Sequence, residues 1–304
     1  MIILQSETLL AKLIQCVPNF SEGRRIDVVK KIVDAIAGAA DVRVVDWSLD
    51  PDHNRSVVTF IGEPCAVRKS MLAGARAAVE LIDLNKHTGG HPRIGAVDVI
   101  PVVPLSDVSI DEAIALGHEI GRDIAENLHI PVYYYEDCAL RGHCVNLANI
   151  RKGGFEGLRE SGLIGDRTPD VGPSELHPTA GAAVVGARGP LIAYNVNLTS
   201  NDTHIARAIA SKIRKLRDSG EGMPGVKAIA VLLKSRDIAQ ISTNITRPDL
   251  VSIYDVYSFV EREAKALGVE VLESELIGAI RSEAVITAAA QALKCPQLTQ
   301  ERVI

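Results

Sequence analysis

The sequence predicts a mixed α/β (α+β) protein built from two ferredoxin-like βαββαβ subdomains whose sheets face a central cleft. The chain has 304 residues, of which 47% are apolar, and this is enough for a large hydrophobic core. Apolar residues recur with a helical period in some segments and form short strand-like runs in others. The order of these segments is the same in both halves of the chain, and it is the split β-α-β order. A cleft between two such sheets is the default ligand site.

The first half contains the elements of the first unit. The helix expected over residues 25–38 has apolar residues at helical spacing, including Val29, Ile32 and Ile36. Ser109 is a typical N-cap residue and is expected to begin a later helix. The expected strands are residues 13–17, 42–47, 56–61, 94–103 and 131–135, and the expected helices are residues 25–38, 65–83 and 110–127.

The second half repeats this order and adds a closing helix. Its expected strands are residues 191–197, 228–233, 239–242 and 269–273, and its expected helices are residues 202–217, 253–267 and 282–293. We place the first subdomain at residues 1–185 and the second at residues 186–304. The Gly-, Asp- and Pro-rich stretch at residues 151–189 is too long for a plain connector, and long loops of this kind are usually functional or disordered. The apolar residues 182–185 favour a segment that packs, and therefore a functional one.

Composition excludes several classes of function. A net charge of -5 argues against a surface that coats nucleic acid, although it permits a local basic pocket. Aromatic residues are only 4% of the chain, so stacking platforms for single strands are not expected. The five cysteines form no Cys-x-x-Cys pair, which suits reduced thiols in a cytoplasm. We expect no signal peptide and no membrane span.

The most informative segment is His87-Thr-Gly-Gly-His-Pro-Arg-Ile-Gly-Ala-Val-Asp98. Glycines and a proline prevent a helix here, so the polar side chains lie on a tight loop that leads into a buried strand. An imidazole such as His91, with Asp98 to fix its tautomer, would suit acid–base catalysis. A zinc site is less favoured, because the two histidines are not on a helix and no cysteine or carboxylate has ligand spacing. The alternative is that both histidines are turn residues.

Three further segments carry polar side chains at the ends of expected strands. Asn19 and Glu22 follow the first strand, where either side chain can reach a ligand. Asn54 and Arg55 precede another strand, and Arg55 can bind a carboxylate through two hydrogen bonds, although an Asx turn with a solvated arginine explains it equally well.

The third segment offers many donors and acceptors for a flat polar heterocycle and contains no nucleotide-phosphate motif. Its residues are Gly172, Pro173, Ser174, Glu175, Leu176, His177, Pro178, Thr179, Ala180 and Gly181.

Together these motifs resemble the glutamate formimidoyltransferase (formiminotransferase) family. The resemblance covers nearly the whole chain from Cys16 onward, and it is to the stand-alone transferase without a cyclodeaminase domain. The motifs that carry it are Val17-Pro-Asn-Phe-Ser-Glu-Gly23, Asn54-Arg55, His91-Pro-Arg-x-Gly-Ala-x-Asp98 with Pro101 and Pro104, Gly172-Pro-Ser174, Ala193-x-Asn-x-Asn-Leu198 and Gln240-x-Ser-Thr-Asn244.

The resemblance implies two α/β subdomains around a folate-binding cleft, with His91 as the catalytic histidine and residues 172–181 as the folate-binding segment. It implies tetrahydrofolate as co-substrate, N-formimino-L-glutamate as donor in histidine degradation, and a homodimer. From the residues themselves we expect a cytoplasmic location and no metal. Glu175, His177 and Thr179 differ from the animal enzymes, so folate contacts can differ too.

From the chemistry we expect His91 to act as general base and then acid, oriented by Asp98. Arg55 and Arg93 are candidates for substrate carboxylates. Two alternatives stay open from the sequence: transfer of a formyl group from 5-formyltetrahydrofolate to glutamate, and folate binding without catalysis.

Overall fold

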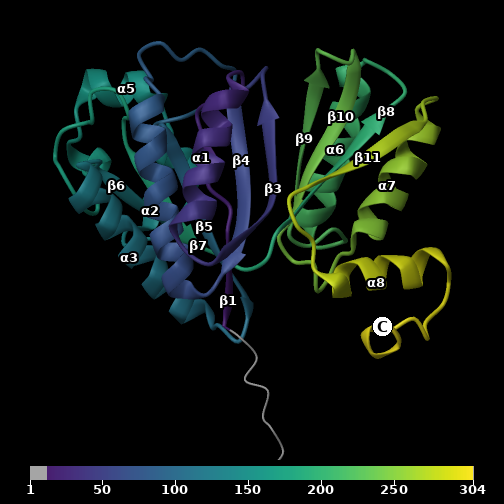
Figure 1. Ribbon diagram of the computed structural model, residues 1–304. Coiled ribbons are helices and arrows are strands. Elements are labelled where there is room, and N and C mark those ends of the chain that lie inside the picture. The colour runs from purple at the N-terminus through teal and green to yellow at the C-terminus, as the bar shows by residue number, and fades with distance from the viewer. Residues whose placement is uncertain (1–11, 304) are drawn as a thin grey trace, which may run out of the picture. The chain divides into compact units, whose positions relative to one another are not determined.

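The computed structural model describes residues 12–303, and the chain forms two compact units that meet at Gly189 and Pro190. Each unit is a β-sheet with helices packed on it (Figure 1). The boundary expected after residue 185 falls inside strand β7 (Ala183–Ala187). The expected mixed α/β class and the two α+β subdomains are confirmed.

The first unit contains a seven-stranded sheet. Strands β1 and β2 occupy one row of the sheet, interrupted at Val17 and Pro18, and pair with β4 on one side and β5 on the other. With β3 next to β4, these rows have the antiparallel order of the split β-α-β unit. The strands are β1 (Leu13–Cys16), β2 (Asn19–Phe20), β3 (Val42–Asp50), β4 (Arg55–Gly62), β5 (Val97–Ser106), β6 (Val132–Glu136) and β7 (Ala183–Ala187).

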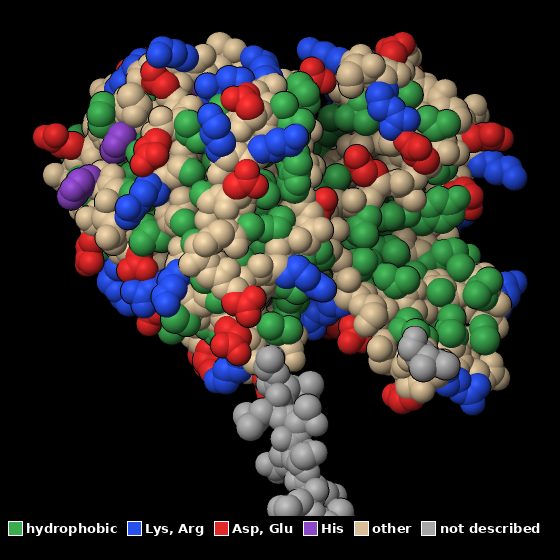
Figure 2. All heavy atoms as spheres, in the orientation of Figure 1, with side chains coloured by type: hydrophobic (Ala, Val, Ile, Leu, Met, Phe, Trp, Pro, Cys, Tyr) green, Lys and Arg blue, Asp and Glu red, His purple; other side chains and the backbone are tan. Residues whose placement is uncertain are grey.

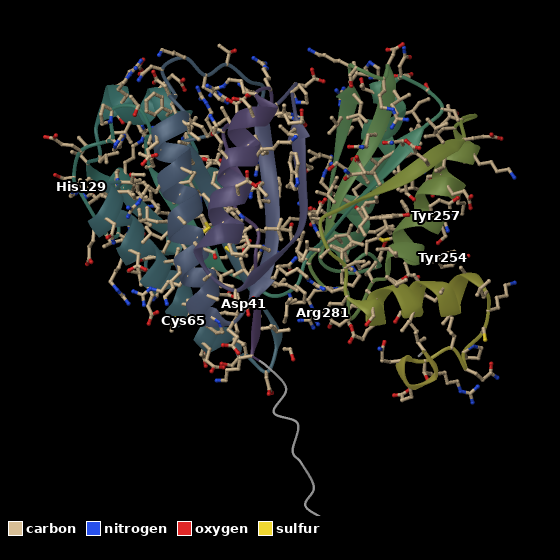
Figure 3. All side chains as sticks on the ribbon, in the orientation of Figure 1. Asp41, Cys65, His129, Tyr254, Tyr257 and Arg281 are labelled. Carbon is tan, nitrogen blue, oxygen red and sulfur yellow. The ribbon has the colours of Figure 1, made fainter. Side chains whose placement is uncertain are left out.

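Three helices bury the core of this unit against one face of the sheet. Helices α1 (Ile26–Ala39) and α2 (Pro64–Leu81) lie side by side over the sheet, and α3 (Ile110–Leu128) packs on β5 and β7 (Figure 1). Ser109 begins α3 with a full capping box, as expected. The helix ends at His129, which is labelled in Figure 3 and has left-handed backbone angles.

The stretch between Arg151 and Gly189, expected as a long loop, holds helix α5 (Gly154–Ser161) and strand β7. Strand β7 lies between β5 and β6 and is parallel to both. Its residues alternate between the two faces of the sheet, so that Val185 joins the core under the helices while Val184 packs on the opposite face. That second core is completed by α5 and the short helix α4 (Leu147–Ile150).

The second unit follows its predicted element order closely. Its sheet has the strand order β11-β8-β10-β9, and α6 and α7 bury its core (Figure 1). This order again matches the split β-α-β unit. The elements are β8 (Ile192–Leu198), α6 (Thr203–Ser219), β9 (Val226–Leu233), β10 (Ile238–Ile245), α7 (Ile253–Ala266), β11 (Val271–Ile277) and α8 (Ser282–Ala292).

The visible surface carries acidic and basic side chains intermixed, without a large region of a single sign (Figure 2). No helix in the described part of the chain is long and apolar enough to cross a membrane.

Candidate active site

The β3–β4 hairpin of the first unit supplies one wall of the site. Asp50 and Arg55 are paired where the two strands meet the turn. Within the turn, the Oδ1 atom of Asp50 accepts a hydrogen bond of 2.9 Å from the backbone N–H of His53, and the other carboxylate oxygen pairs with His53 Nδ1. Asn54 has a φ of 51°, a left-handed conformation that asparagine tolerates better than most residues. The Asp-Pro-Asp-His-Asn sequence therefore folds as a turn that fixes the His53 ring.

The loop from His87 to Asp98 lies against this turn. The Gly90 N–H donates to the Asp52 carbonyl over 3.3 Å, and the Asn54 amide donates to the Thr88 carbonyl over 3.0 Å. A Cβ atom on Gly89 would lie only 2.3 Å from the His53 carbonyl oxygen. Gly89 is therefore needed because two backbones approach closely here.

Arg55 links the hairpin to this loop. Its Nε and Nη2 atoms donate to Asn19 Oδ1 over 3.1 and 2.5 Å, and its Nη1 contacts the His91 ring, including Nε2. Burial lowers the pKa of Arg55 to about 10. Asn19 is itself buried and anchored by its amide to the Val17 carbonyl. Both predicted residues thus belong to one network with His91.

The His91 ring is held in one tautomer. Its Nδ1 donates to the Pro92 carbonyl over 2.7 Å, which leaves Nε2 with the lone pair that faces Arg55. Burial, together with the charges of Arg55 and Arg151, lowers the pKa of His91 to about 4. His91 is therefore neutral at physiological pH and can act as a base.

His91 borders a cavity of about 780 Å³ within the first unit. The cavity wall combines the glycine-rich loop with residues from α4 and α5, and its polar side chains include Arg93, Asn146, Arg151, Lys152 and Glu156. Cations of this kind favour an anionic ligand.

Asp98 does not orient His91, which corrects the expected pairing. One of its carboxylate oxygens accepts from the Ile94 N–H over 2.8 Å and the other pairs with Arg151. Among residues 12–303, no hydrogen bond joins Asp98 to His91. The Pro92 carbonyl fixes the tautomer of the ring instead.

The guanidinium group of Arg93 is also occupied by contacts within the protein. It donates to His87 Nδ1 over 2.7 Å and forms a salt bridge of 2.9 Å with Glu156. The other nitrogen of His87 donates to the Asn54 carbonyl over 2.9 Å, and burial lowers the pKa of His87. His87 and Arg93 therefore hold the loop together, a structural role that the turn-residue alternative assigned to both histidines.

Glu22 and Asn54 have local structural contacts that differ from the ligand-facing position expected for them. Glu22 accepts hydrogen bonds from the backbone N–H groups of Arg24 and Arg25, both at 2.9 Å, just before α1. The side-chain oxygen of Asn54 accepts from the Gly23 N–H over 2.9 Å. Both residues also line a second cavity of about 540 Å³, next to His87.

Within the segment from Gly172 to Gly181, residues 177–181 form a tight turn in front of β7. His177 and Gly181 exchange two backbone hydrogen bonds, and His177 Nδ1 accepts from the Ala180 N–H over 3.0 Å. The Thr179 carbonyl accepts from the Leu84 N–H over 2.8 Å, which ties the turn to the end of α2. Thr179 is the member of this segment that lines the 540 Å³ cavity.

Two residues near His91 were missing from the sequence-based candidates. The His53 ring lies edge-on to the His91 ring, with 5.8 Å between ring centroids and 86° between ring planes. Arg151 lines the same cavity as His91, and its Nε is buried without a hydrogen-bond partner among the described residues. His53 could have been found from its place in the Asp-x-x-His turn beside Arg55, whereas Arg151 has no local signal.

The second unit carries a row of amides on the face of its sheet away from α6 and α7. Gln240 Nε2 donates to Asn197 Oδ1 over 2.9 Å, and Asn195 donates to Glu275 over 3.1 Å. Asn197 also donates to Glu273 over 3.2 Å. This row accounts for Asn195, Asn197 and Gln240 of the Ala193–Leu198 and Gln240–Asn244 motifs.

No group of three histidine, cysteine, aspartate or glutamate side chains suited to a metal occurs in the described part of the chain. The side chains around His91 include a second imidazole, His53, and the guanidinium groups of Arg55 and Arg151. This combination can move protons and hold an anion.

Comparisons with known proteins agree with these motifs. Residues 13–188 match the formiminotransferase domain, N-terminal subdomain, and residues 193–301 match the formiminotransferase domain. A glutamate formimidoyltransferase of Streptococcus pyogenes serotype M1 is 41% identical over 92% of this chain and 93% of its own length. One of Thermoplasma acidophilum is 43% identical over 91% of each chain.

A longer relative has the same kind of domain in a larger protein. The formimidoyltransferase-cyclodeaminase of Rattus norvegicus is 39% identical over 92% of this chain, which covers 52% of the relative. The matches to both units therefore show that the chain belongs to the formiminotransferase family and is a transferase.

Proposed function

We propose that this protein transfers the formimino group from N-formimino-L-glutamate to N5 of tetrahydrofolate, giving 5-formiminotetrahydrofolate and L-glutamate in histidine degradation. The observation that carries the proposal is the neutral His91 imidazole, held by the Pro92 carbonyl and Arg55 beside a cavity that contains Arg151. The relatives named above are glutamate formimidoyltransferases, which supports the same donor and acceptor.

His91 acts as the base in this reaction. The N5 nitrogen attacks the formimino carbon and must lose its proton, and a neutral imidazole accepts a proton in this way. The Nε2 lone pair of His91 becomes available when Arg55 Nη1 turns to a substrate carboxylate, while the other bonds of Arg55 to Asn19 persist. Arg55 therefore serves as both a carboxylate-binding group and a cover for the base.

The anionic substrates bind beside cations of the first unit. Arg151 lines the cavity and keeps an unpartnered Nε among the described residues beside its ion pair with Asp98, whereas Arg93 donates both to His87 and to Glu156. We therefore assign the substrate carboxylate to Arg55 and Arg151 rather than to Arg93. Residues 172–181 are proposed as the folate-binding segment, with Thr179 as the residue that lines a cavity.

The first experiment mixes the purified protein with tetrahydrofolate and N-formimino-L-glutamate and follows both glutamate release and the folate ultraviolet spectrum. A parallel reaction contains 5-formyltetrahydrofolate and L-glutamate. Turnover mainly in the first mixture supports the proposal, and turnover mainly in the second replaces it with formyl transfer. Folate binding without turnover in either mixture rejects the catalytic proposal.

The expected homodimer and cytoplasmic location remain proposals of their own. Sedimentation of the purified protein at several concentrations tests the first, because a dimer has twice the mass of one chain. Fractionation of the source cells tests the second.

A further inference from the structure

His53 and His91 differ in what their ring nitrogens contact. Both nitrogens of His91 are engaged, Nδ1 with the Pro92 carbonyl and Nε2 with Arg55. His53 uses Nδ1 for Asp50, and its Nε2 has no hydrogen-bond partner within residues 12–303. The His53 side chain is 38% exposed, so this free nitrogen belongs to a ring that a ligand can reach.

An imidazole backed by a carboxylate at Nδ1 is suited to carry a proton on Nε2. The carboxylate fixes the tautomer and stabilises the protonated ring. Burial by itself raises the pKa of Asp50, but hydrogen bonds from the His53 side chain and backbone outweigh it and lower the pKa. Asp50 is therefore a carboxylate at neutral pH, and its negative charge compensates the positive charge of a protonated His53.

We propose that His53, held by Asp50 and edge-on to His91, is a second acid–base residue of this site that protonates the leaving glutamate nitrogen. This inference rests on the proposed formimino transfer. It divides the two proton transfers between two rings instead of assigning both to His91.

The step balances as follows. The N5–carbon bond forms, and the N5 proton passes to His91 Nε2. The bond between the same carbon and the glutamate nitrogen then breaks as that nitrogen takes the proton from His53 Nε2, so glutamate leaves with a neutral amine. Finally, the protonated His91 returns its proton to His53. The ring centroids are 5.8 Å apart, and one intervening water can make this transfer.

His91 by itself is poorly suited to take the proton from N5 and also to deliver one to the glutamate nitrogen. Burial and the charges of Arg55 and Arg151 disfavour its protonated form. A proton taken from N5 therefore tends to leave His91 quickly, and His53 with its carboxylate is the neighbouring group that can hold it.

Several charged groups surround His53 and must be considered in any pH profile. Asp50 and Asp52 belong to its own hairpin, and Arg55 follows on β4. His91 faces it from the glycine-rich loop. Arg24 approaches from the segment before α1, where its Nε donates to the Pro51 carbonyl. Among these groups, only Asp50 bonds to the His53 ring in the described structure.

The test compares kcat as a function of pH for the full-length wild type, His53→Asn and Asp50→Asn, with Asp52→Asn as the matched control. Asp52 lies in the same exposed turn, so its replacement removes a nearby charge without altering the Asp50–His53 pair. Asparagine at position 53 can still donate to Asp50, which preserves the turn. Circular dichroism and thermal unfolding establish that each variant is folded.

We expect His53→Asn to lower kcat about 100-fold at neutral pH, the lower end of the usual effect of an acid–base residue. The loss should also change with pH, because the variant lacks one of the two proton-transfer groups. Asp50→Asn should lower kcat about tenfold, since the protonated ring loses its carboxylate. Asp52→Asn should match the wild type within a factor of two.

Two results would overturn the inference while the proposed function stands. One is a His53→Asn variant with wild-type kcat, and the other is a folded variant whose rate falls equally at every pH, as a purely structural residue would cause. A wild type without formimino transfer rejects the proposed function and this inference together.

Discussion

Asp98 and Arg151 form an ion pair that is buried on both sides, with only 3% and 10% of their side-chain surfaces exposed. Asp98 lies in β5, and Arg151 follows the short helix α4. The pair joins the central strand of the first unit to the segment that lines the His91 cavity. Because the second Asp98 oxygen accepts from the Ile94 N–H, the pair also fixes the end of the loop that carries His91.

Breaking this pair should destabilise the protein strongly. Replacing Arg151 with methionine leaves the Asp98 carboxylate buried without its cation, which typically costs about 3–5 kcal/mol. Urea unfolding measures the loss. The control is Arg247→Met, which removes an exposed pair with Asp249 and should leave the free energy of unfolding nearly unchanged. Equal stability of the two variants would contradict the expectation that loss of the buried Asp98–Arg151 pair destabilises the protein.

The low pKa of His91 should set the acid limb of the activity profile. Activity requires the neutral His91 ring, so on the acid side it is lost as pH falls through the pKa of about 4. In Arg55→Gln a nearby positive charge is absent, so the pKa of His91 should rise toward its ordinary value of 6.5 and the acid limb should move to higher pH.

The matched control for this shift is Arg93→Gln, because Arg93 is not among the groups that lower the pKa of His91. Its acid limb should stay in place. Initial rates between pH 3.5 and about 8 measure the acid limb of each variant. This range spans both the lowered pKa of His91 and its ordinary value. An Arg55 variant with an unmoved limb would mean that another group controls it.

His91 should be indispensable for the chemical step. His91→Ala is expected to lower kcat by about 10²–10⁴-fold while tetrahydrofolate binding is largely kept, since a lost base affects the proton transfer more than ground-state binding. Stopped-flow rates and a fluorescence titration with folate separate the two quantities. Turnover close to that of the wild type would exclude His91 as the base.

Gly89 and Gly90 should respond differently to alanine. A Cβ on Gly89 would lie 2.3 Å from the His53 carbonyl oxygen, whereas a Cβ on Gly90 would have its nearest neighbour at 3.8 Å. We expect Gly89→Ala to lower the free energy of unfolding by about 1–3 kcal/mol, as other forced contacts do, and Gly90→Ala to change it by less than about 1 kcal/mol. Similar losses in the two variants would show that the contact is relieved without strain.

Activity should survive treatment with EDTA followed by gel filtration. The proposed reaction requires proton transfers at nitrogen and neutralisation of carboxylates, which imidazole and guanidinium groups supply. Elemental analysis of the treated protein confirms that metal is gone. Loss of activity that returns with one added divalent cation would contradict the expectation that no metal takes part.

The sequence predicted the elements well where local rules dominate. Ser109 begins α3 because its side chain and Glu112 satisfy each other's backbone N–H groups, and both residues lie within one turn. The second unit follows its predicted order because its helices and strands have clear apolar periods. The amino acids around Gly172 instead suggested a loop, and the strand β7 behind it went unrecognised because Gly186 and the alanines are small.

The sequence predicts which residues belong to the candidate site better than it predicts which contacts they make. His91, Arg55 and Asn19 do come together, because two strands and one loop end at the same place. Glu22 and Asn54, in contrast, satisfy backbone N–H groups, a need that becomes visible only when the surrounding segments are folded. The spacing of His91 and Asp98 suggested a pair, but the intervening backbone turns the carboxylate toward Ile94 and Arg151.

The family, the two repeated units and the loop that carries His91 can be recognised from the amino acids, since these depend on residue type and on spacing along the chain. Three contacts become visible only in the folded chain: Arg151 pairs with Asp98, Arg93 pairs with Glu156, and His53 lies beside His91. The physical reason is that a charged side chain pairs with whatever opposite charge the folded backbone brings near, and His53 and His91 are brought together by packing of two turns.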